Sequence, residues 1–387
     1  MNIIHLAPIL SISRESKRKE RSINFAAEGL SVSVPNLAKS QKKAGNNVGI
    51  VSCFPSENAL SEDIYWATLN KNFLHFFIYK KIFKDIIENF GNIDLLNIHD
   101  IYNLRQIFFS LHFMFKGVKV FVTPRGTFSQ QALKRSRLKK FVFIQIYKIY
   151  AIFIYAFVAL NEGEKKQIRK VFPKKKIIII GNGVDYSEER NNSLINFFEE
   201  KNKSKIFNVG FLGRFDIHIK GLDLLLNAYL EYQKRVKKIE VKLFLIGKHK
   251  IAPEWNSVQF IKEIRDKLPL PQMLEIRGPF YGSHKWEELA KLDILIQPSR
   301  TEGMPNTVLE AMATGIPSVV TANTNMGELI LDCSAGWKID TSEDAILEFL
   351  LNLKNFDKKD LTDLGNNAKK CVQRELTWDS IGNIKYF

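Results

Sequence analysis

Two carboxylates eight positions apart stand in the stretch of the chain that is most able to do chemistry. Glu302 lies in a loop that follows a mostly apolar run at 292–296, and Glu310 lies on a helix that we expect to begin near Asn306 or Thr307. A helix N-terminus at the carboxyl end of a parallel strand binds anions. The pattern therefore predicts an α/β sheet edge where carboxylates bind vicinal hydroxyls beside a phosphate. The alternative interpretation is an acid favoured by the helix dipole plus an unrelated surface acid.

Two cations follow another predicted strand in the same half of the chain. Arg214 comes directly after the apolar run at 209–212, and Lys220 follows six residues later, just before a predicted helix. The planar guanidinium of an arginine and the point charge of a lysine can together neutralise a diphosphate leaving group. We therefore expect Arg214 and Lys220 to act in catalysis.

The stretch TEGMPNTVLEAMATGIP at 301–317 resembles the E-x7-E segment of the retaining family 4 glycosyltransferases of GT-B fold. The family's G-R and K-G pairs are matched at 213–214 and 220–221, and its N-G-V-D turn at 182–185. The resemblance covers most of the chain and is strongest from about 206 to 330. It implies two Rossmann-like domains of α/β class, whose parallel sheets face each other across a cleft.

The resemblance also implies the roles of the site residues. Arg214, Lys220 and Glu302 would be catalytic, with Glu302 orienting sugar hydroxyls while the donor's own phosphate helps to take the acceptor proton. Donor binding would fall to residues at the loop, at neighbouring strand ends and at one early helix: Gly213, Arg277, Gly278, Gly303, Met304, Pro305, Asn306, Thr307, Glu310 and Gly29.

The first half offers polar residues at two predicted strand ends. His99 and Asp100 end one apolar run, and Arg125 with Gly126 follows another. Related transferases usually have a histidine where this chain has Arg125, which suggests an arginine that binds phosphate or acceptor. We place these four residues near the acceptor or sugar. A loop-capping aspartate beside an exposed histidine remains the alternative for the first pair.

The net charge of +16 is confined to the first half of the chain. Residues 1–185 contain 29 Lys and Arg against 13 Asp and Glu, which leaves the remainder balanced. Basic residues beside an aromatic helix are typical of enzymes that lie on anionic lipid. The predicted membrane surface comprises Lys134, Arg135, Arg137, Lys139 and Lys140 beside the helix at 141–153. An ordinary solvated helix face is the alternative.

Other features bound the class of protein. Three cysteines without metal spacing predict reduced thiols in a cytoplasmic protein, and no cluster of ligands or Asp-x-Asp motif suggests a metal, so we expect no cofactor. The first residues read as a strand without the basic region of a signal peptide. No nucleic-acid module and no G-x-G-x-x-G after the first strand can be found, which disfavours nucleic-acid binding and dinucleotide oxidoreduction.

We thus expect an N-terminal acceptor-binding domain at 1–185, completed by a C-terminal helix at 374–387, a linker at 186–205, and a nucleotide-sugar domain at 206–373. The predicted protein is a metal-independent, retaining hexosyltransferase at the cytoplasmic face of the cell membrane. It would use a UDP- or GDP-linked sugar to extend a lipid-linked or cell-surface glycan of bacterial type, such as lipopolysaccharide, O-antigen, capsule or exopolysaccharide. A catalytically silent GT-B module that serves as a membrane scaffold remains the alternative.

Overall fold

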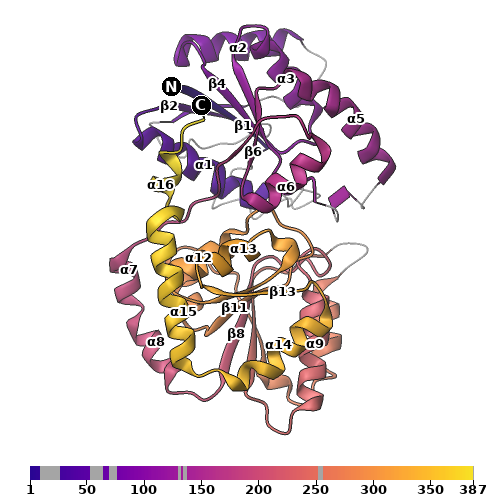
Figure 1. Ribbon diagram of the computed structural model, residues 1–387, viewed down its shortest axis with the longest axis vertical. Helices are drawn as coiled ribbons and strands as arrows, with labels where there is room; N and C mark the ends of the chain where they lie inside the picture. Colours follow the sequence, from indigo (N-terminus) through magenta and orange to yellow (C-terminus); the bar gives the residue numbers. More distant parts are fainter. Residues whose placement is uncertain are drawn as a thin grey trace. The chain divides into compact units, whose positions relative to one another are not determined.

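The computed structural model describes residues 1–8, 27–52, 64–68, 76–129, 132–133, 137–251 and 256–386. Contacts divide the chain into two compact units, Met1–Gly183 with Trp378–Phe387, and Val184–Thr377. Each unit is built on one parallel β-sheet between helices (Figure 1). Both sheets therefore have the α/β architecture that the sequence predicts.

The sheet of the first unit has seven strands in the order β3-β2-β1-β4-β5-β6-β7, all paired in parallel. Its strands read as short runs of Val, Ile, Leu and Phe, as expected where helices cover both faces of a sheet. Their bounds are β1 (Asn2–Ala7), β2 (Asn47–Ser52), β3 (Tyr65–Thr68), β4 (Leu95–His99), β5 (Lys119–Thr123), β6 (Ala156–Ala159) and β7 (Ile177–Ile179).

The helices of the first unit connect these strands and include one from the far end of the chain. The C-terminal helix packs on the first helix so closely that a side chain on Gly382 would collide with Ser40. Tyr386, beyond that helix, is 1% exposed in the core of this unit. The bounds are α1 (Ala27–Lys43), α2 (Phe76–Phe90), α3 (Leu104–Met114), α5 (Arg137–Phe153), α6 (Glu162–Val171) and α16 (Trp378–Gly382).

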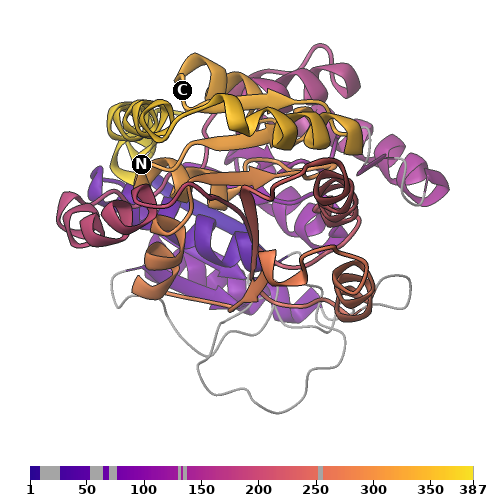
Figure 2. The ribbon, with the colours of Figure 1, turned by 90° about the horizontal axis from the view of Figure 1, so that it is seen from below.

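The second unit has a six-stranded parallel sheet in the order β10-β9-β8-β11-β12-β13. Figure 2 shows this sheet with helices on both of its faces. The strand bounds are β8 (Phe207–Leu212), β9 (Val241–Ile246), β10 (Leu274–Arg277), β11 (Ile294–Gln297), β12 (Ser318–Thr321) and β13 (Gly336–Ile339).

The helices of the second unit correct one prediction. The segment 186–205, expected to be a linker, forms two helices that belong to this unit, because apolar side chains such as the 3% exposed Leu194 pack within it. The polar composition of that segment reflects their solvated faces. The bounds are α7 (Glu188–Ser193), α8 (Ile195–Asn202), α9 (Leu222–Arg235), α10 (Ser257–Arg265), α11 (Ser283–Ala290), α12 (Asn306–Thr314), α13 (Gly327–Asp332), α14 (Glu343–Asn352) and α15 (Lys358–Cys371).

Each sheet has one point at which the order of its strands reverses. In the first unit the chain builds outward from β1 to β2 and β3, and then returns to add β4 on the other side. In the second unit β8 takes the place of β1, and β11 takes the place of β4. Ligands of open α/β sheets bind beyond the carboxyl ends of the strands at such a switch point. Among the described residues, no helix is both long and apolar enough to span a bilayer.

Candidate functional site

The switch point of the second unit brings two loops together at the carboxyl ends of β8 and β11. Gly221, which precedes α9, has a φ of 67° and lies so close to the β11 loop that a Cβ would collide with the carbonyl oxygen of Pro298. Only glycine combines this left-handed backbone with so close an approach. The contact places the residue before it, Lys220, beside the loop that carries Glu302.

Lys220 and Glu302 form an ion pair, in which the ammonium Nζ donates a hydrogen bond to the Oε1 of the carboxylate. Their side chains are 20% and 17% exposed, so one side of the pair is open to solvent. The sequence predicted both residues as catalytic, and the structure brings them into direct contact across 82 positions of sequence. Because one side of the pair is open to solvent, a charged ligand can reach its two partners.

A chain of hydrogen bonds orients the carboxylate of Glu302. The hydroxyl of Thr307 donates to Gln297 Oε1 over 3.3 Å, Gln297 Nε2 donates to Ser299 over 2.8 Å, and Ser299 Oγ donates to Glu302 Oε1 over 3.1 Å. The Nδ2 of Asn325 also donates to the backbone carbonyl of Glu302 over 2.7 Å. Glu302 is therefore held by both its side chain and its backbone.

Arg214 lies at the end of β8 and is 17% exposed. Its Nη2 is 3.7 Å from the Oδ2 of Asp216, and the same oxygen accepts a hydrogen bond of 2.5 Å from Lys250. Burial would raise the pKa of Asp216, but the hydrogen bond and the charge of Lys250 outweigh it and lower that pKa. The aspartate is thus ionised between two cations, and with Lys220 and Glu302 the edge carries one positive charge in excess, which suits a diphosphate.

Glu310, the second acid of the motif, lies inside helix α12 and is 9% exposed. The Nζ of Lys285, on α11, donates a hydrogen bond of 2.7 Å to its Oε1. Burial raises the pKa of Glu310, and the charge of Lys285 opposes that rise. Beside them the guanidinium of Arg190 stacks on Trp286 at 3.7 Å. The expected ribose-binding acid therefore already has one cationic partner.

The remaining residues of the motif confirm the position of the helix. Helix α12 begins at Asn306, as expected, and its N-cap is Pro305, which makes no side-chain hydrogen bond. The hydroxyl of Thr307 bonds to Gln297. Met304 is 7% exposed and, with Gly303, forms the loop that leads into the helix.

Three other predicted donor-binding positions lie at the edge formed by β8, β9 and β10. Gly213 has a φ of 152°, and its carbonyl oxygen would collide with a Cβ on Gly247, so the ends of β8 and β9 nearly touch. The side chain of Arg277 bonds to Glu275 over 2.6 Å and to Glu288 over 2.9 Å. Within this unit Arg277 is thus held by acids, and Gly278 follows it with a φ of 82°.

The switch point of the first unit holds a pair of buried histidines. His5 on β1 and His99 on β4 are both fully buried, and His5 Nδ1 lies 2.9 Å from His99 Nε2. Burial lowers the pKa of His5 to about 4, and burial, followed by the charge of Arg125, lowers the pKa of His99 well below its usual value. Both rings are therefore neutral at pH 7. The sequence predicted His99 but missed His5, although a histidine inside the apolar strand NIIHLA was a visible signal.

Arg125 fixes the direction of the hydrogen bonds in this cluster. Its Nε donates to His99 Nδ1 over 3.2 Å, so His99 must carry its proton on Nε2 and donate to His5. His5 in turn donates from Nε2 to Gln41 over 2.7 Å. The Nη1 of Arg125 donates to Ser33 and Asn182, each over 3.1 Å. We expected Arg125 to bind phosphate or the acceptor. In the structure its guanidinium already donates hydrogen bonds to three acceptors of its own unit.

The other predicted residues of this edge have local structural contacts. Asp100 has a φ of 71°, and its Oδ1 accepts a hydrogen bond of 2.6 Å from the backbone of Ile101. Gly126 donates its backbone N–H to the buried carboxylate of Glu164. Gly29, in the first turn of α1, is exposed. Asp100 and Gly126 thus shape the loops that follow β4 and β5.

The predicted membrane surface is only partly described. Lys134 and Arg135 lie outside the described residues, and Arg137, Lys139 and Lys140 stand in the first turn of α5, where only the backbone is described. Further along α5 apolar side chains face outward, with Phe141, Ile149, Ile152 and Phe153 between 61% and 69% exposed. The opposite face buries Tyr147 and Tyr150. The helix therefore carries apolar side chains on its outer face as well as on its buried face.

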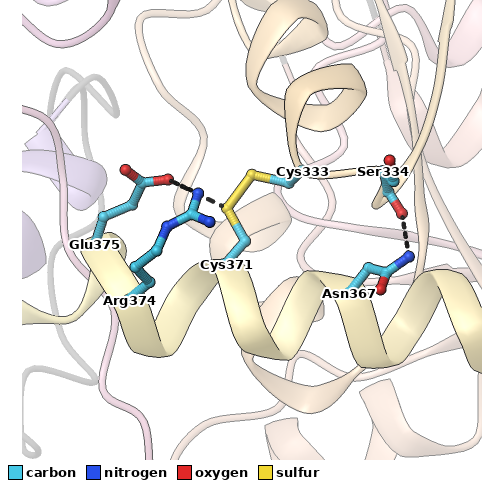
Figure 3. The surroundings of a disulfide bond; sticks show 6 residues. All are labelled: Cys333, Ser334, Asn367, Cys371, Arg374 and Glu375. Atoms are coloured by element: carbon cyan, nitrogen blue, oxygen red, sulfur yellow. Dashed lines mark hydrogen bonds and ion pairs between the residues drawn. A yellow bond between two sulfur atoms is a disulfide. The ribbon is translucent and has the colours of Figure 1, made fainter.

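A disulfide between Cys333 and Cys371 corrects the prediction of reduced thiols, while Cys53 lies outside the described residues. Figure 3 shows the bond between the residue after α13 and the last residue of α15. These cysteines are 38 positions apart in the sequence, and their Cα atoms lie 5.8 Å apart. Glu375 lies beside them, with its Oε1 3.7 Å from Cys371 Sγ.

Family models cover most of the chain. Residues 27–188 match the model described as Glycosyltransferase Family 4, and residues 206–355 match the model described as Glycosyl transferases group 1. The second of these matches includes Lys220, Glu302 and Glu310.

Relatives of known name are glycosyltransferases. The capsular polysaccharide biosynthesis glycosyltransferase CapM of Staphylococcus aureus is 23% identical over 288 residues, which cover 69% of this chain and 72% of CapM. The uncharacterized glycosyltransferase MJ1178 of Methanocaldococcus jannaschii is 26% identical over 50% of this chain and 52% of its own length. The chain thus spans about half the length of that relative, and a quarter of sucrose synthase 5 of Arabidopsis thaliana.

Solved structures share the fold. Alr3699/HepE of Anabaena in complex with UDP superposes with a TM-score of 0.72 over 99% of this chain and 97% of that one, at 16% identity. Sucrose-phosphate synthase of Thermosynechococcus elongatus gives a TM-score of 0.74 over 99% and 96%, at 15% identity. WaaG, an enzyme of lipopolysaccharide biosynthesis, gives 0.65 over 98% and 97%, at 14% identity. These likenesses establish the GT-B class of fold.

Proposed function

Because the chain belongs to the group 1 glycosyltransferases of family 4, we propose that it is a retaining hexosyltransferase that uses a nucleotide-diphosphate sugar, UDP- or GDP-linked. The acceptor is a lipid-linked or cell-surface polysaccharide. The contact between Lys220 and Glu302 at the switch point of the second unit carries the proposal, since it sets a cation for a leaving group beside an acid for sugar hydroxyls. The capsular polysaccharide enzyme CapM among the relatives supports the polysaccharide acceptor.

The proposed reaction breaks the bond between the anomeric carbon and the phosphate oxygen, and forms the new glycosidic bond on the same face of the sugar. The acceptor proton passes to the departing phosphate. Lys220 and Arg214 neutralise the charge that develops on the diphosphate, and such preorganised charge stabilisation supplies most of the rate enhancement of many enzymes. Glu302 binds hydroxyls of the sugar, and Glu310 binds the ribose. Because two cations supply the positive charge, we propose a mechanism that needs no metal.

We also propose that the first unit lies on the inner face of the cell membrane through helix α5. Its outer face presents Phe141, Ile149, Ile152 and Phe153 to solvent, directly after a run of basic residues. Apolar side chains can enter the boundary of the headgroups while each Lys or Arg near an anionic surface adds about 1 kcal/mol. The positive charge of residues 1–185 matches such a surface.

A thermal-shift screen tests the donor site. Wild-type protein is heated with UDP, GDP, ADP or CMP and with their common sugars, in buffer and then with EDTA. A ligand that binds the folded state raises the melting temperature by mass action. We expect one nucleoside diphosphate to raise the melting temperature with and without EDTA. The sugar derivative of that nucleotide should be turned over with release of the nucleoside diphosphate. A folded protein that responds to none would favour the silent scaffold.

Vesicle flotation tests the membrane surface. Replacing Arg135, Arg137, Lys139 and Lys140 by Gln should release the protein from anionic vesicles, as should Ile149→Ser with Phe153→Ser. Val258→Ser, at a 46% exposed position of the second unit, is the matched control and should float like the wild type. Undiminished flotation of both multiple variants would refute this surface.

A further inference from the structure

Arg300 joins the two loops of the proposed catalytic edge. Its backbone N–H donates to the carbonyl oxygen of Ile219 over 2.9 Å, and its Nη1 donates to that of His218 over 2.8 Å. The same guanidinium donates to both carboxylate oxygens of Asp223, over 2.6 Å from Nη1 to Oδ1 and 2.7 Å from Nη2 to Oδ2. Arg300 thus contacts the segment that carries Lys220 on either side of that residue.

The sequence positions make this contact relevant to the reaction. Arg300 stands two residues before Glu302, and Asp223 stands three residues after Lys220 in the first turn of α9. The fork therefore spans the gap between the loop of β8 and the loop of β11. Gly221 packs against Pro298 but has no side chain that could hold the two loops together.

The geometry is that of a strong ion pair. Bidentate pairs between a guanidinium and a carboxylate fix orientation as well as distance, which a lysine cannot do. The side chains of Arg300 and Asp223 are 18% and 16% exposed, so solvent screens the pair less than it screens a surface pair. Displacement of a catalytic group by about 1 Å can reduce a rate by about 100-fold.

We propose that Arg300 is a positioning residue. It holds the segment 218–223 against the loop 298–302, and thereby sets the place at which the ammonium of Lys220 meets Glu302 and the diphosphate of the donor. Its guanidinium is engaged by the carbonyl oxygen of His218 and by Asp223, so it acts through Lys220. This inference rests on the proposed function, because it assigns Lys220 and Glu302 to the reaction.

The test compares Arg300→Met, Asp223→Asn and the double variant with the wild type. The donor is the nucleotide sugar that raises the wild-type melting temperature, with UDP-glucose as the first probe, and turnover is release of the nucleoside diphosphate. We expect kcat to fall by about 10- to 100-fold while KM for the donor changes by less than about threefold. The double variant should be no worse than the worse single variant, because one contact is removed twice. Arg300→Lys should restore only part of the rate.

Two controls separate positioning from general damage. Lys358→Met removes a partly buried partner of Asp293 in the same unit, at a contact of 2.5 Å, and should lower the melting temperature without a comparable fall in kcat. Hydrogen exchange in the absence of ligand should rise at 216–223 in Arg300→Met and stay unchanged there in Lys358→Met. Unchanged exchange at 216–223, or an equal loss of kcat in Lys358→Met, would overturn the inference.

Lys220→Ala in the same series tells the two proposals apart. If Lys220→Ala loses its rate and Arg300→Met keeps its own, positioning by Arg300 is wrong while the proposed function stands. If Lys220→Ala turns over normally, the proposed function itself fails. In that case the exchange data still decide whether Arg300 holds the segment.

Discussion

The switch points of the two sheets hold polar groups of opposite electrostatic character. In the second unit, Lys220 and Glu302 form an ion pair with one side open to solvent. In the first unit, His5 and His99 are neutral and fully buried, with one hydrogen bond between them and one from Arg125 to His99. Both places follow from the same topology, in which the strand order reverses between β1 and β4 and between β8 and β11.

The difference shows two ways to preorganise a sheet edge. Paired charges keep a site ready for a charged ligand, because each partner can exchange the other for a phosphate or a hydroxyl. The hydrogen-bonded pair of neutral histidines, His5 and His99, cannot exchange charged partners in this way, but its geometry is fixed. It links the edge of the first sheet to the end of the chain, since Gln41, the acceptor of His5, donates in turn to the hydroxyl of Tyr386 over 3.1 Å.

The largest expected effect comes from a substitution that disturbs the backbone beside the ion pair of Lys220 and Glu302. Gly221→Ala drives a Cβ into the carbonyl oxygen of Pro298 and strains a φ of 67°, so we expect it to destabilise the second unit by about 3 kcal/mol or more. Gly45→Ala, in the first unit, has a φ of 84° and open space around it, and should cost only about 1 kcal/mol of strain. Urea unfolding of both variants measures this, and equal losses would contradict the close approach.

The next effect concerns the pH dependence of stability that the neutral histidine His5 causes. Burial lowers the pKa of His5 from 6.5 to about 4, so the unfolded chain binds more protons between these values. The stability that neutral His5 contributes is present above pH 6.5 and is lost as the pH falls through about 4, on the order of 3 kcal/mol. Melting temperatures of the wild type and His5→Gln between pH 7 and 4 check this. The wild type should lose more on acidification, and parallel curves would contradict it.

The third effect concerns catalysis and tests the role of Lys220 in its ion pair with Glu302. Lys220→Ala should reduce turnover of the donor by about 100-fold, because a preorganised cation at the leaving group is removed. The fold should survive, since the side chain is 20% exposed. Release of nucleoside diphosphate from the donor measures the rate. Near-normal turnover would remove Lys220 from the mechanism.

The smallest effect separates binding from chemistry within the second unit. Glu310→Gln should raise KM for the donor by about tenfold and change kcat little, because a charged acceptor for ribose hydroxyls becomes a neutral one. Glu328→Gln, in an exposed pair with Lys338, is the control and should leave both constants unchanged. A fall in kcat alone would place Glu310 in the chemical step.

Some of the candidate site could be predicted from local spacing. The segment 301–317 has a strand end, a glycine and proline turn and a helix within a few residues of each other, so Glu302, Glu310 and the start of α12 at Asn306 were predictable. Arg214 and Lys220 were predictable for the same reason, as they flank one strand end and one helix start. The two α/β domains follow from apolar runs that alternate with helical periods.

Contacts between distant segments could not be predicted in this way. Nothing local to Lys285 marks it as the partner of Glu310, and nothing local to Arg300 marks it as the partner of Asp223. The same holds for the disulfide and for the helices at 186–205, whose polar composition resembled that of a linker.

The sequence by itself determined which chemistry this protein can carry, because residue types and short spacings decide where cations, carboxylates and helix ends stand. The tertiary structure alone decided how those groups are paired, since pairing depends on strand order. The crossover that sets β8 beside β11 brings Lys220 to Glu302, and the one that sets β1 beside β4 brings His5 to His99. Strand order arises from packing over the whole sheet, which no short stretch of sequence encodes.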